Sequence, residues 1–149
     1  MKRAPSLALG TLFALSAWTA ETKIKVEELP PAVQKAMKEQ SKGAAILGAS
    51  KEQENGRTTY EIETKLAGKG RNLTFDESGS LLEVEREMDL DSIPAPAKEA
   101  ILKNAANETV QKVESVTSGS STQYEAHIKT NSGKTREVVV NGEGTIQQE

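Results

Sequence analysis

His127 is the only histidine of the 149-residue sequence and the first side chain to consider for catalysis or metal binding. Polar and apolar residues alternate around it as in a strand, which places it on a polar face between Glu125 and Lys129. Zinc would need further ligands, and the sequence has no cysteine and no second histidine. No serine lies in a Gly-x-Ser-x-Gly nucleophile motif. We therefore expect a solvated His127, no metal or cofactor, and no enzymatic activity, with a hydrolase that uses His127 as the remote alternative.

Two glycine-rich segments, Gly68-Lys69-Gly70 and Gly142-Glu143-Gly144, have the composition of phosphate-binding loops. Such a loop needs a following helix whose N-terminal amides meet the anion, and here strand-like sequence follows each segment. We therefore expect hairpin turns at both places. Asp76-Glu77-Ser78-Gly79 lacks the alternating acidic positions of a calcium loop and is also predicted to be a turn.

A set of charged residues that occurs twice is our candidate for partner binding. Its members are predicted to point away from the helix-covered face of a sheet. They are Glu61, Lys65 and Arg71 in the first half and Glu125, Lys129 and Arg136 in the second. For the two arginines a second orientation is open, because alternation with Leu73 and Val138 could turn them toward the covered face.

Tyr60 and Tyr124 form a repeated pair of candidate aromatic anchors. Two matched tyrosines could hold a ligand across a pseudo-symmetric sheet. Each also shares a strand face with apolar residues, for example Ile62 or Ile128, and could fill a core between helix and sheet. We favour the core interpretation, because each aromatic side chain buries a large apolar area and this sequence has few of them to fill its core.

Glu83, Glu85 and Glu87 form an acidic row on one face of a predicted strand. Such a row could meet a basic partner, but a charge run is more often a solvated face, and we favour the solvated interpretation.

The stretch Thr58–Gly79 recurs in large part in the second half of the sequence. An offset of 64 residues relates Thr58, Tyr60, Glu61 and Lys65 to Thr122, Tyr124, Glu125 and Lys129. An offset of 65 residues relates Gly68, Lys69, Arg71 and Gly79 to Gly133, Lys134, Arg136 and Gly144. A single one-residue gap aligns both halves, and such self-similarity indicates a duplicated architecture.

Each copy of the repeat is preceded by a predicted helix. Leu29-Pro30-Pro31 opens the first helix, since proline is tolerated in the first turn, and an apolar stripe at helical spacing begins at Val33. Gly43 is a suitable C-terminal stop. Ile93-Pro94 opens the second helix, whose stripe of smaller side chains begins at Ala97.

After each helix the apolar period changes from 3.6 to 2, as expected for strands. In the first copy, Asn55-Gly56, Ala67–Gly70 and Asp76–Gly79 are predicted turns that separate four antiparallel strands. The second copy begins with Val110–Thr117, whose valines are three residues apart, so that a bulge or an extended helix is open there. The last strand of the second copy is cut short at the C-terminus.

Residues 1–20 have the pattern of a secretory signal peptide. Lys2 and Arg3 give a basic start, Leu7–Ala17 is apolar, and small residues continue to Ala20. The apolar run is too short to span a bilayer, which needs about 20 apolar residues. We predict cleavage between residues 17 and 20 and a periplasmic or secreted mature chain without stable membrane insertion.

Composition limits the partners and the architecture. The formal net charge is −3 at pH 7, and without a basic stripe the chain is not expected to bind nucleic acid. An exported chain without cysteine must be stabilised by its apolar core alone. Each half is about the size at which a lone domain is marginally stable. We therefore expect the two halves to pack together as one continuous sheet.

The order of these features resembles the PepSY-like family, which is also described as beta-lactamase-inhibitor-like. In the first copy the likeness rests on Leu29-Pro30-x-Ala32-Val33, Ala36-Met37, Tyr60-Glu61, Gly68-Lys69 and Phe75-Asp76-x-x-Gly79. In the second copy it rests on Ile93-Pro94, Ala100-Ile101, Tyr124-Glu125, Gly133-Lys134 and Val140-Asn141-x-x-Gly144. The resemblance covers nearly all of residues 24–149. It implies a helix-covered sheet, an exported location, and a binding or inhibitory role in place of catalysis.

The chain departs from the family pattern in its second copy and in its aromatic content. Ala97 stands where the first copy has Val33, and the last strand is truncated. Beta-lactamase inhibitors bind through aromatic-rich sheet surfaces, whereas the mature chain keeps only Tyr60, Phe75 and Tyr124. We therefore do not extend beta-lactamase inhibition to this chain.

Together these features predict an α+β fold of two tandem αββββ repeats, residues 21–92 and 93–149, behind the signal peptide. The helices pack on one face of an antiparallel sheet, and the other face is open and polar. The leading hypothesis is an exported, non-enzymatic module that binds an envelope or secreted protein or peptide through this open face, with inhibition as its narrower form. The alternative is a periplasmic small-ligand sensor or carrier, with a pocket between helices and sheet or between the repeats.

Overall fold

The structure is a computed structural model that describes residues 21–147, so the predicted signal peptide lies outside the described residues. The helices are α1 (Pro31–Gln40) and α2 (Ala95–Ala105), each preceded by a short 3-10 helix, η1 (Val26–Glu28) or η2 (Leu90–Ser92). The strands are β1 (Thr22–Ile24), β2 (Ala45–Glu54), β3 (Arg57–Leu66), β4 (Lys69–Asp76), β5 (Leu81–Met88), β6 (Thr109–Ser118), β7 (Ser121–Lys129) and β8 (Thr135–Asn141). Within residues 21–147, neither helix is long and apolar enough to cross a membrane.

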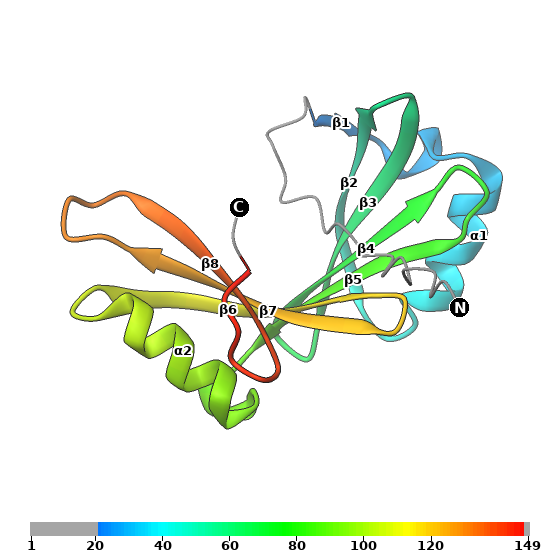
Figure 1. Cartoon of the computed structure of the whole chain (residues 1–149). Coiled ribbons are helices and arrows are strands. Elements are labelled where there is room, and N and C mark those ends of the chain that lie inside the picture. Colours follow the sequence, from blue (N-terminus) through cyan, green and yellow to red (C-terminus); the bar gives the residue numbers. More distant parts are fainter. Residues whose placement is uncertain (1–20, 148–149) are drawn as a thin grey trace, which may run out of the picture.

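All eight strands of the described chain form one antiparallel sheet in the order β1 to β8, which confirms the predicted continuous sheet. β5 and β6 join the two halves through paired residues that run from Glu83 opposite Ser118 to Met88 opposite Val113. The sheet twists strongly along this order, so that its two halves form the arms of a V (Figure 1). The helices lie on the outer sides of the arms, and the helix-free face lines the inside.

Both helices cover the same face of the sheet, as the sequence predicts. Val84 of β5 lies opposite Leu73 of β4, and both pack in the cluster beneath α1. Met88 lies on the same face of β5, opposite Val113, and packs in the cluster beneath α2. The fold class is therefore α+β, with helices on one face only.

The apolar core is divided into two clusters, one beneath each helix. α1 contributes Val33 and Met37 to the first cluster, and α2 contributes Ala97, Ile101 and Ala105 to the second. The smaller side chains of α2 agree with the weaker stripe seen in the sequence. The halves thus share a sheet but not a core, and the pairing of β5 with β6 couples them.

Tight turns with left-handed backbone connect the strands. Asn55 and Gly56 have φ values of 50° and 76°, as a two-residue type I′ hairpin requires, and Ala67 and Gly68 repeat this with 50° and 84°. The matching turn between β7 and β8 is longer, and Thr130–Lys134 closes it through backbone hydrogen bonds. This longer turn accounts for the change of the repeat offset from 64 to 65 residues.

A second repeated turn docks the sheet on the start of each helix. The side chains of Asp76 and Asn141 each accept two backbone N–H groups, two and four residues ahead, at 2.8–3.1 Å. Gly79 and Gly144 follow in these turns with φ values of 81° and 84°. A Cβ at either glycine would approach a carbonyl oxygen of the helix start to 2.6 or 2.5 Å. Only glycine therefore fits both the backbone angle and the close approach.

Two features of the second repeat that the sequence leaves open are defined by the structure. The pairing of β6 with β7 shifts between Val110 and Lys112, which is a β-bulge and not an extended helix. A matching shift lies in β2 of the first repeat. After β8, Ile146 forms an isolated bridge with Val140, so within residues 21–147 the predicted last strand is reduced to this bridge.

Candidate functional site

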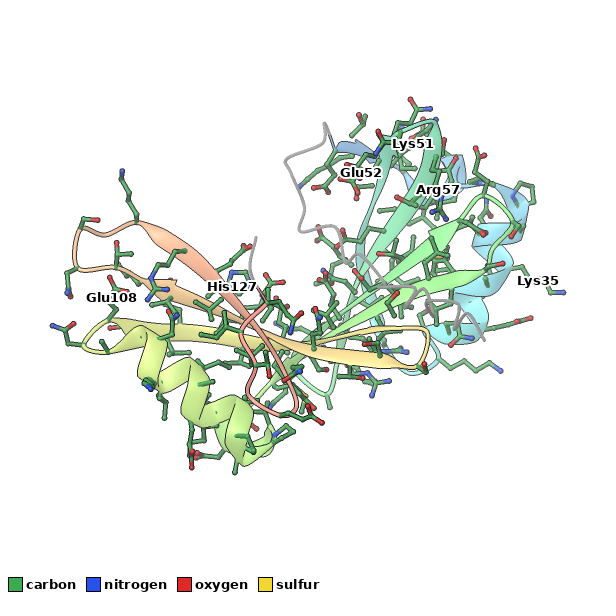
Figure 2. All side chains as sticks on the ribbon, viewed as in Figure 1. Lys35, Lys51, Glu52, Arg57, Glu108 and His127 are labelled. Atoms are coloured by element: carbon green, nitrogen blue, oxygen red, sulfur yellow. The ribbon has the colours of Figure 1, made fainter. Side chains whose placement is uncertain are left out.

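The helix-free face of the sheet is the candidate functional site, because strand alternation collects carboxylates there from both repeats. On β3, for example, Ile62 is buried under α1, and Glu61 and Glu63 point to the other face. We call this surface the open acidic face. Its carboxylates include Glu52, Glu61, Glu63, Glu83, Glu85, Glu87, Glu114, Glu125 and Glu137. Figure 2 shows His127 on the inner side of one arm and Lys35 on the outer side of α1.

Asn72 links two carboxylates of this face within the first repeat. Its Nδ2 donates to Oε1 of Glu61 at 2.8 Å and lies 3.5 Å from Oε2 of Glu85. Burial and three neighbouring carboxylates raise the pKa of Glu61 to about 7, against the opposing effect of the Asn72 hydrogen bond. Glu61 is therefore partly protonated near neutral pH.

Glu85 lies where the two repeats meet. Burial, followed by the charges of Glu61 and Glu114 and then of Glu83 and Glu125, raises the pKa of Glu85 to about 7. Glu83 and Glu85 are half-buried, so the solvated face expected for this acidic row is wrong for both. The twisted sheet brings carboxylates of both arms toward β5, which strand alternation alone does not reveal.

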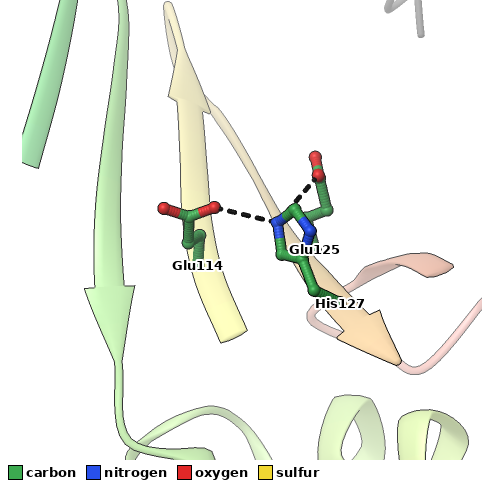
Figure 3. Close-up of side chains that lie close together, drawn as sticks. All are labelled: Glu114, Glu125 and His127. Carbon is green, nitrogen blue, oxygen red and sulfur yellow. Dashed lines mark hydrogen bonds and ion pairs between the residues drawn. The ribbon is translucent and has the colours of Figure 1, made fainter. Parts of the chain in front are cut away.

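His127 is half-buried and contacts three carboxylates, so the expectation of a solvated histidine is also wrong. Its Nε2 lies 3.1 Å from Oε2 of Glu114 and 3.3 Å from Oε1 of Glu125 (Figure 3). On the opposite side of the ring, Nδ1 lies 3.6 Å from Oε1 of Glu137. Lys112 completes the group, with its Nζ 2.7 Å from Oε1 of Glu114.

These surroundings raise the pKa values of His127 and Glu125 and lower that of Glu114. The hydrogen bond with Glu114 raises the pKa of His127, although burial opposes it. Burial alone would raise the pKa of Glu114, but hydrogen bonds with His127 and Lys112 outweigh it and hold that pKa below its usual range. Burial, with the charge of Glu137, raises the pKa of Glu125. His127 therefore holds its proton more firmly than a free imidazole does.

Four of the predicted binding residues lie on the open acidic face. Glu61 and Glu125 are half-buried near the middle of their strands, β3 and β7. Lys65 and Lys129 lie at the ends of the same strands and are exposed. The structure thus brings the glutamates into the carboxylate cluster and leaves the lysines at its margin.

Arg71 and Arg136 face the helices, so the outward orientation is wrong for both, and the alternative toward the covered face is correct. Arg71 donates from Nη1 to the backbone oxygen of Gln40 at 2.8 Å, at the end of α1. Arg136 donates to Oδ1 and the backbone oxygen of Asn104 at 2.6 and 3.0 Å, near the end of α2, and pairs with Glu108 at 2.7 Å. The two arginines therefore donate hydrogen bonds to backbone carbonyl groups at the C-terminal ends of the helices, where cations are favoured.

Tyr60 and Tyr124 also lie on the helix-covered face, which confirms the core interpretation. Tyr60 is 6% exposed in the cluster under α1 and lies opposite Phe75. Tyr124 is half-buried against the cluster under α2 and lies opposite Val140. Neither tyrosine contributes to the open acidic face.

The sequence does not predict Glu114 and Glu137 as neighbours of His127, because they lie on other strands. Cross-strand neighbours depend on register, and register depends on turn length. The two-residue loop Gly119-Ser120 places Glu114 opposite Glu125, and recognising that loop would have found the first neighbour. Glu137 lies opposite His127 across a longer turn, whose length the sequence does not fix.

A half-open hollow of ≈ 360 Å³ lies beside β8. Its lining includes Asn104 and Arg136, whose polar groups bond to each other, and the apolar Val139 and Ile146. All of its lining residues belong to the second repeat, so it does not lie between the repeats. Its volume is at the low end of the range of about 300–1,000 Å³ for ligand pockets.

The geometry defines a duplicated protein with helices on one face of a sheet and an acidic, helix-free face. The family described as "Putative beta-lactamase-inhibitor-like, PepSY-like" matches residues 15–83 and 66–148, two segments that overlap. The chain belongs to this family, as its motifs predict. No curated protein sequence matches the chain.

Several solved structures from Bacteroides species share the fold. A "putative periplasmic" protein of Bacteroides eggerthii is 18% identical with a TM-score of 0.69, over 80% of this chain and 86% of that chain. A DUF2874 family protein of Bacteroides ovatus is 18% identical with a TM-score of 0.65, over 80% and 85%. A BLIP-like protein of Bacteroides fragilis is 21% identical with a TM-score of 0.59, over 78% and 82%. At these identities the likeness establishes the fold alone.

Proposed function

We propose that the chain is an exported, non-enzymatic module that binds a basic protein or peptide of the cell envelope through the open acidic face. Support for export comes from the signal-peptide pattern of residues 1–20 and from the periplasmic description of a protein with the same fold. One observation carries the proposal. At the junction of the repeats, burial together with the charges of carboxylates from both repeats raises the pKa of Glu85 to about 7.

A partner rich in lysine and arginine complements this face. The carboxylates repel one another, which is part of the reason that Glu61 and Glu85 are partly protonated at neutral pH. Cations of a partner would relieve this repulsion and return both groups to the charged form. Such an interaction gains specificity and association rate from charge and weakens as salt increases.

The surroundings of His127 support binding in preference to hydrolysis. Both ring nitrogens face carboxylates, and among residues 21–147 the polar contacts of the ring include no serine or threonine hydroxyl. A histidine that acts as a general base needs a nucleophile within hydrogen-bond reach. His127 is better suited to pairing with the carboxylates of the face.

Two further inferences belong to this proposal. Inhibition of the bound partner is its narrower form, in line with the description of the family and of a BLIP-like structure with the same fold. We also infer that the unit of duplication is αββββ. In the second copy its last strand is shortened to the bridge at Ile146.

Affinity capture from a periplasmic extract tests the proposal. Immobilised residues 21–149 are expected to retain a basic protein that elevated salt releases. Glu61→Lys combined with Glu125→Lys should abolish capture, because it reverses charge in both halves of the face. The matched control, Glu39→Lys with Glu99→Lys, makes the same charge change at exposed positions of α1 and α2 and should retain capture.

Capture that survives the open-face variant, or that the control variant loses equally, would contradict the proposal. If no protein is captured and a metabolite raises the melting temperature, the small-ligand carrier becomes the better account. The hollow beside β8 is then its candidate pocket.

A further inference from the structure

The second repeat brings one imidazole and two carboxylates together from two neighbouring strands. Glu114 comes from β6, and Glu125 and His127 come from β7. One potential ligand atom of each residue lies within 4.8 Å of the others. Figure 3 shows both carboxylates directed at the same ring nitrogen, Nε2. His127 is the only histidine of the chain, so this grouping of donors occurs once.

The distances around Nε2 match the edges of a tetrahedral metal site. Zn–N bonds of ~2.0–2.1 Å and Zn–O bonds of ~2.0–2.2 Å place neighbouring ligand atoms ~3.3–3.5 Å apart. The observed separations are 3.1 Å between Nε2 and Glu114 Oε2 and 3.3 Å between Nε2 and Glu125 Oε1. The third separation, between the two carboxylate oxygens, is within 4.8 Å.

The opposite side of the imidazole is arranged as it is in metal-binding histidines. A histidine that binds a metal through one nitrogen usually donates its other N–H to a carboxylate, a carbonyl or water, which fixes the ring orientation. Here Nδ1 lies 3.6 Å from Oε1 of Glu137, which pairs with His127 across β7 and β8. Glu137 is thus in place to orient the ring while Nε2 faces the other two carboxylates.

Lys112 does not block this arrangement, because it uses the other oxygen of Glu114. Its Nζ lies 2.7 Å from Oε1, whereas Oε2 is the atom that faces His127. A further carboxyl, that of Glu85, lies close enough for the charges of Glu114 and Glu125 to act on it. A divalent cation at Nε2 would be stabilised by this field.

We propose that Glu114, Glu125 and His127 bind a divalent transition metal of the zinc type, with a fourth position left to solvent. Imidazole with carboxylate suits zinc and its neighbours in the periodic table, whereas calcium and magnesium take oxygen ligands in larger number. The site goes beyond the proposed partner binding and does not depend on it. It also revises the sequence-based expectation of no metal, which rested on the absence of cysteine and of a second histidine.

Proton release accompanies metal binding at this site. Nε2 of His127 faces Glu114 and Glu125, and the other charged groups near the ring are Lys112 and Glu137. The metal must displace the Nε2 proton of His127, so its affinity should increase with pH. We expect tighter zinc binding at pH 8 than at pH 6.

The first repeat supplies a matched control, because it lacks the site. By the repeat offset and the strand register, Ser50, Glu61 and Glu63 occupy the positions of Glu114, Glu125 and His127. Glu61 is equivalent to Glu125 but lies beside Asn72 and has no imidazole neighbour. Glu61→Gln should therefore leave metal affinity unchanged, whereas Glu125→Gln should reduce it.

Isothermal titration of untagged residues 21–149 with zinc chloride alone tests the site. We expect one equivalent to bind. His127→Ala should weaken the affinity by ~100-fold or more, and Glu137→Gln by ~10-fold. Circular dichroism verifies that each variant is folded. The visible spectrum of bound Co²⁺ in the unaltered protein should have the intensity of tetrahedral coordination, a readout that needs no variant.

Two results would overturn the site. One is the absence of saturable zinc binding by the unaltered protein, with Co²⁺ giving only the spectrum of the aqueous ion. The other is zinc binding that His127→Ala and Glu61→Gln affect equally. Failure of partner capture would leave the zinc titration unaffected, so the two proposals fail separately.

Discussion

The pKa values of single carboxylates determine how much negative charge the open acidic face carries at a given pH. Glu85 is the clearest case, because Glu61 acts on it from the first repeat and Glu114 from the second. Burial, followed by these charges, raises the pKa of Glu85 in the folded chain from 4.5 to about 7. The face therefore carries less negative charge at pH 6 than at pH 8.

Replacing Glu85 with glutamine should stabilise the protein at alkaline pH. The folded chain holds the Glu85 proton more tightly than the unfolded chain does, so stability falls as pH rises from 4.5 through about 7. A pKa unit corresponds to about 1.4 kcal/mol, and solvent screening reduces this. We expect Glu85→Gln to increase the free energy of unfolding at pH 8 by about 1–2 kcal/mol and to have little effect at pH 4.5.

Urea denaturation at the two pH values measures this effect. Glu39→Gln, at an exposed position of α1, is the control and should change neither value. An equal effect of Glu85→Gln at both pH values would show that Glu85 is not held in its protonated form by the fold.

At the residue scale, the sequence predicts which face a side chain occupies better than it predicts its neighbours. Alternation along β3 and β7 places Glu61 and Glu125 on the open face, and the tyrosines under the helices, without knowledge of register. The orientation of Arg71 and Arg136 could not be decided, because charge favoured one face and alternation the other. Helix C-termini accept these cations, and this interaction is visible only once the helices are positioned.

At the scale of elements, the repeated turns attach each helix to the sheet. The turns that begin at Asp76 and Asn141 bring Gly79 and Gly144 against the first turns of α1 and α2. Substitutions at these glycines act through both a left-handed backbone and a steric contact. Gly133 has a similar φ of 82°, but a Cβ there would have no atom within 4 Å.

Gly144→Ala should therefore destabilise the protein more than Gly133→Ala. The left-handed backbone alone costs about 1 kcal/mol for alanine, which is the whole effect expected at Gly133. At Gly144, the added Cβ would lie 2.5 Å from the backbone oxygen of Pro96, and we expect a loss of about 2–4 kcal/mol. Urea midpoints of the two variants measure the difference. Equal midpoints would mean that the turn does not dock on α2 as described.

The elements could largely be predicted from the sequence, because their signals are local. Asn55-Gly56 defines the turn between β2 and β3, and the prolines define where both helices begin. The bulges could be suspected from the valine spacing but not located. Their positions depend on how β2 and β6 curve over the cores, which no local pattern records.

At the scale of the whole molecule, duplication produces one sheet with two cores and a shared open face. The pairing of β5 with β6 aligns the strands of both repeats, and the twist turns the open acidic face to the inside of the V (Figure 1). The continuous sheet could be predicted from the marginal size of each half. The twist could not, although it is what brings Glu61 and Glu114 within electrostatic reach of Glu85.

The role of the open acidic face is tested most directly by mapping where a captured partner binds. Residues 21–149 labelled with ¹⁵N are titrated with the protein retained in the affinity experiment, and amide chemical shifts are followed. We expect the perturbed amides to cluster in β3 to β7, around Glu61, Glu85 and Glu125. Their chemical shifts should return to those of the free protein at high salt. Perturbations confined to α1 and α2 would contradict the account.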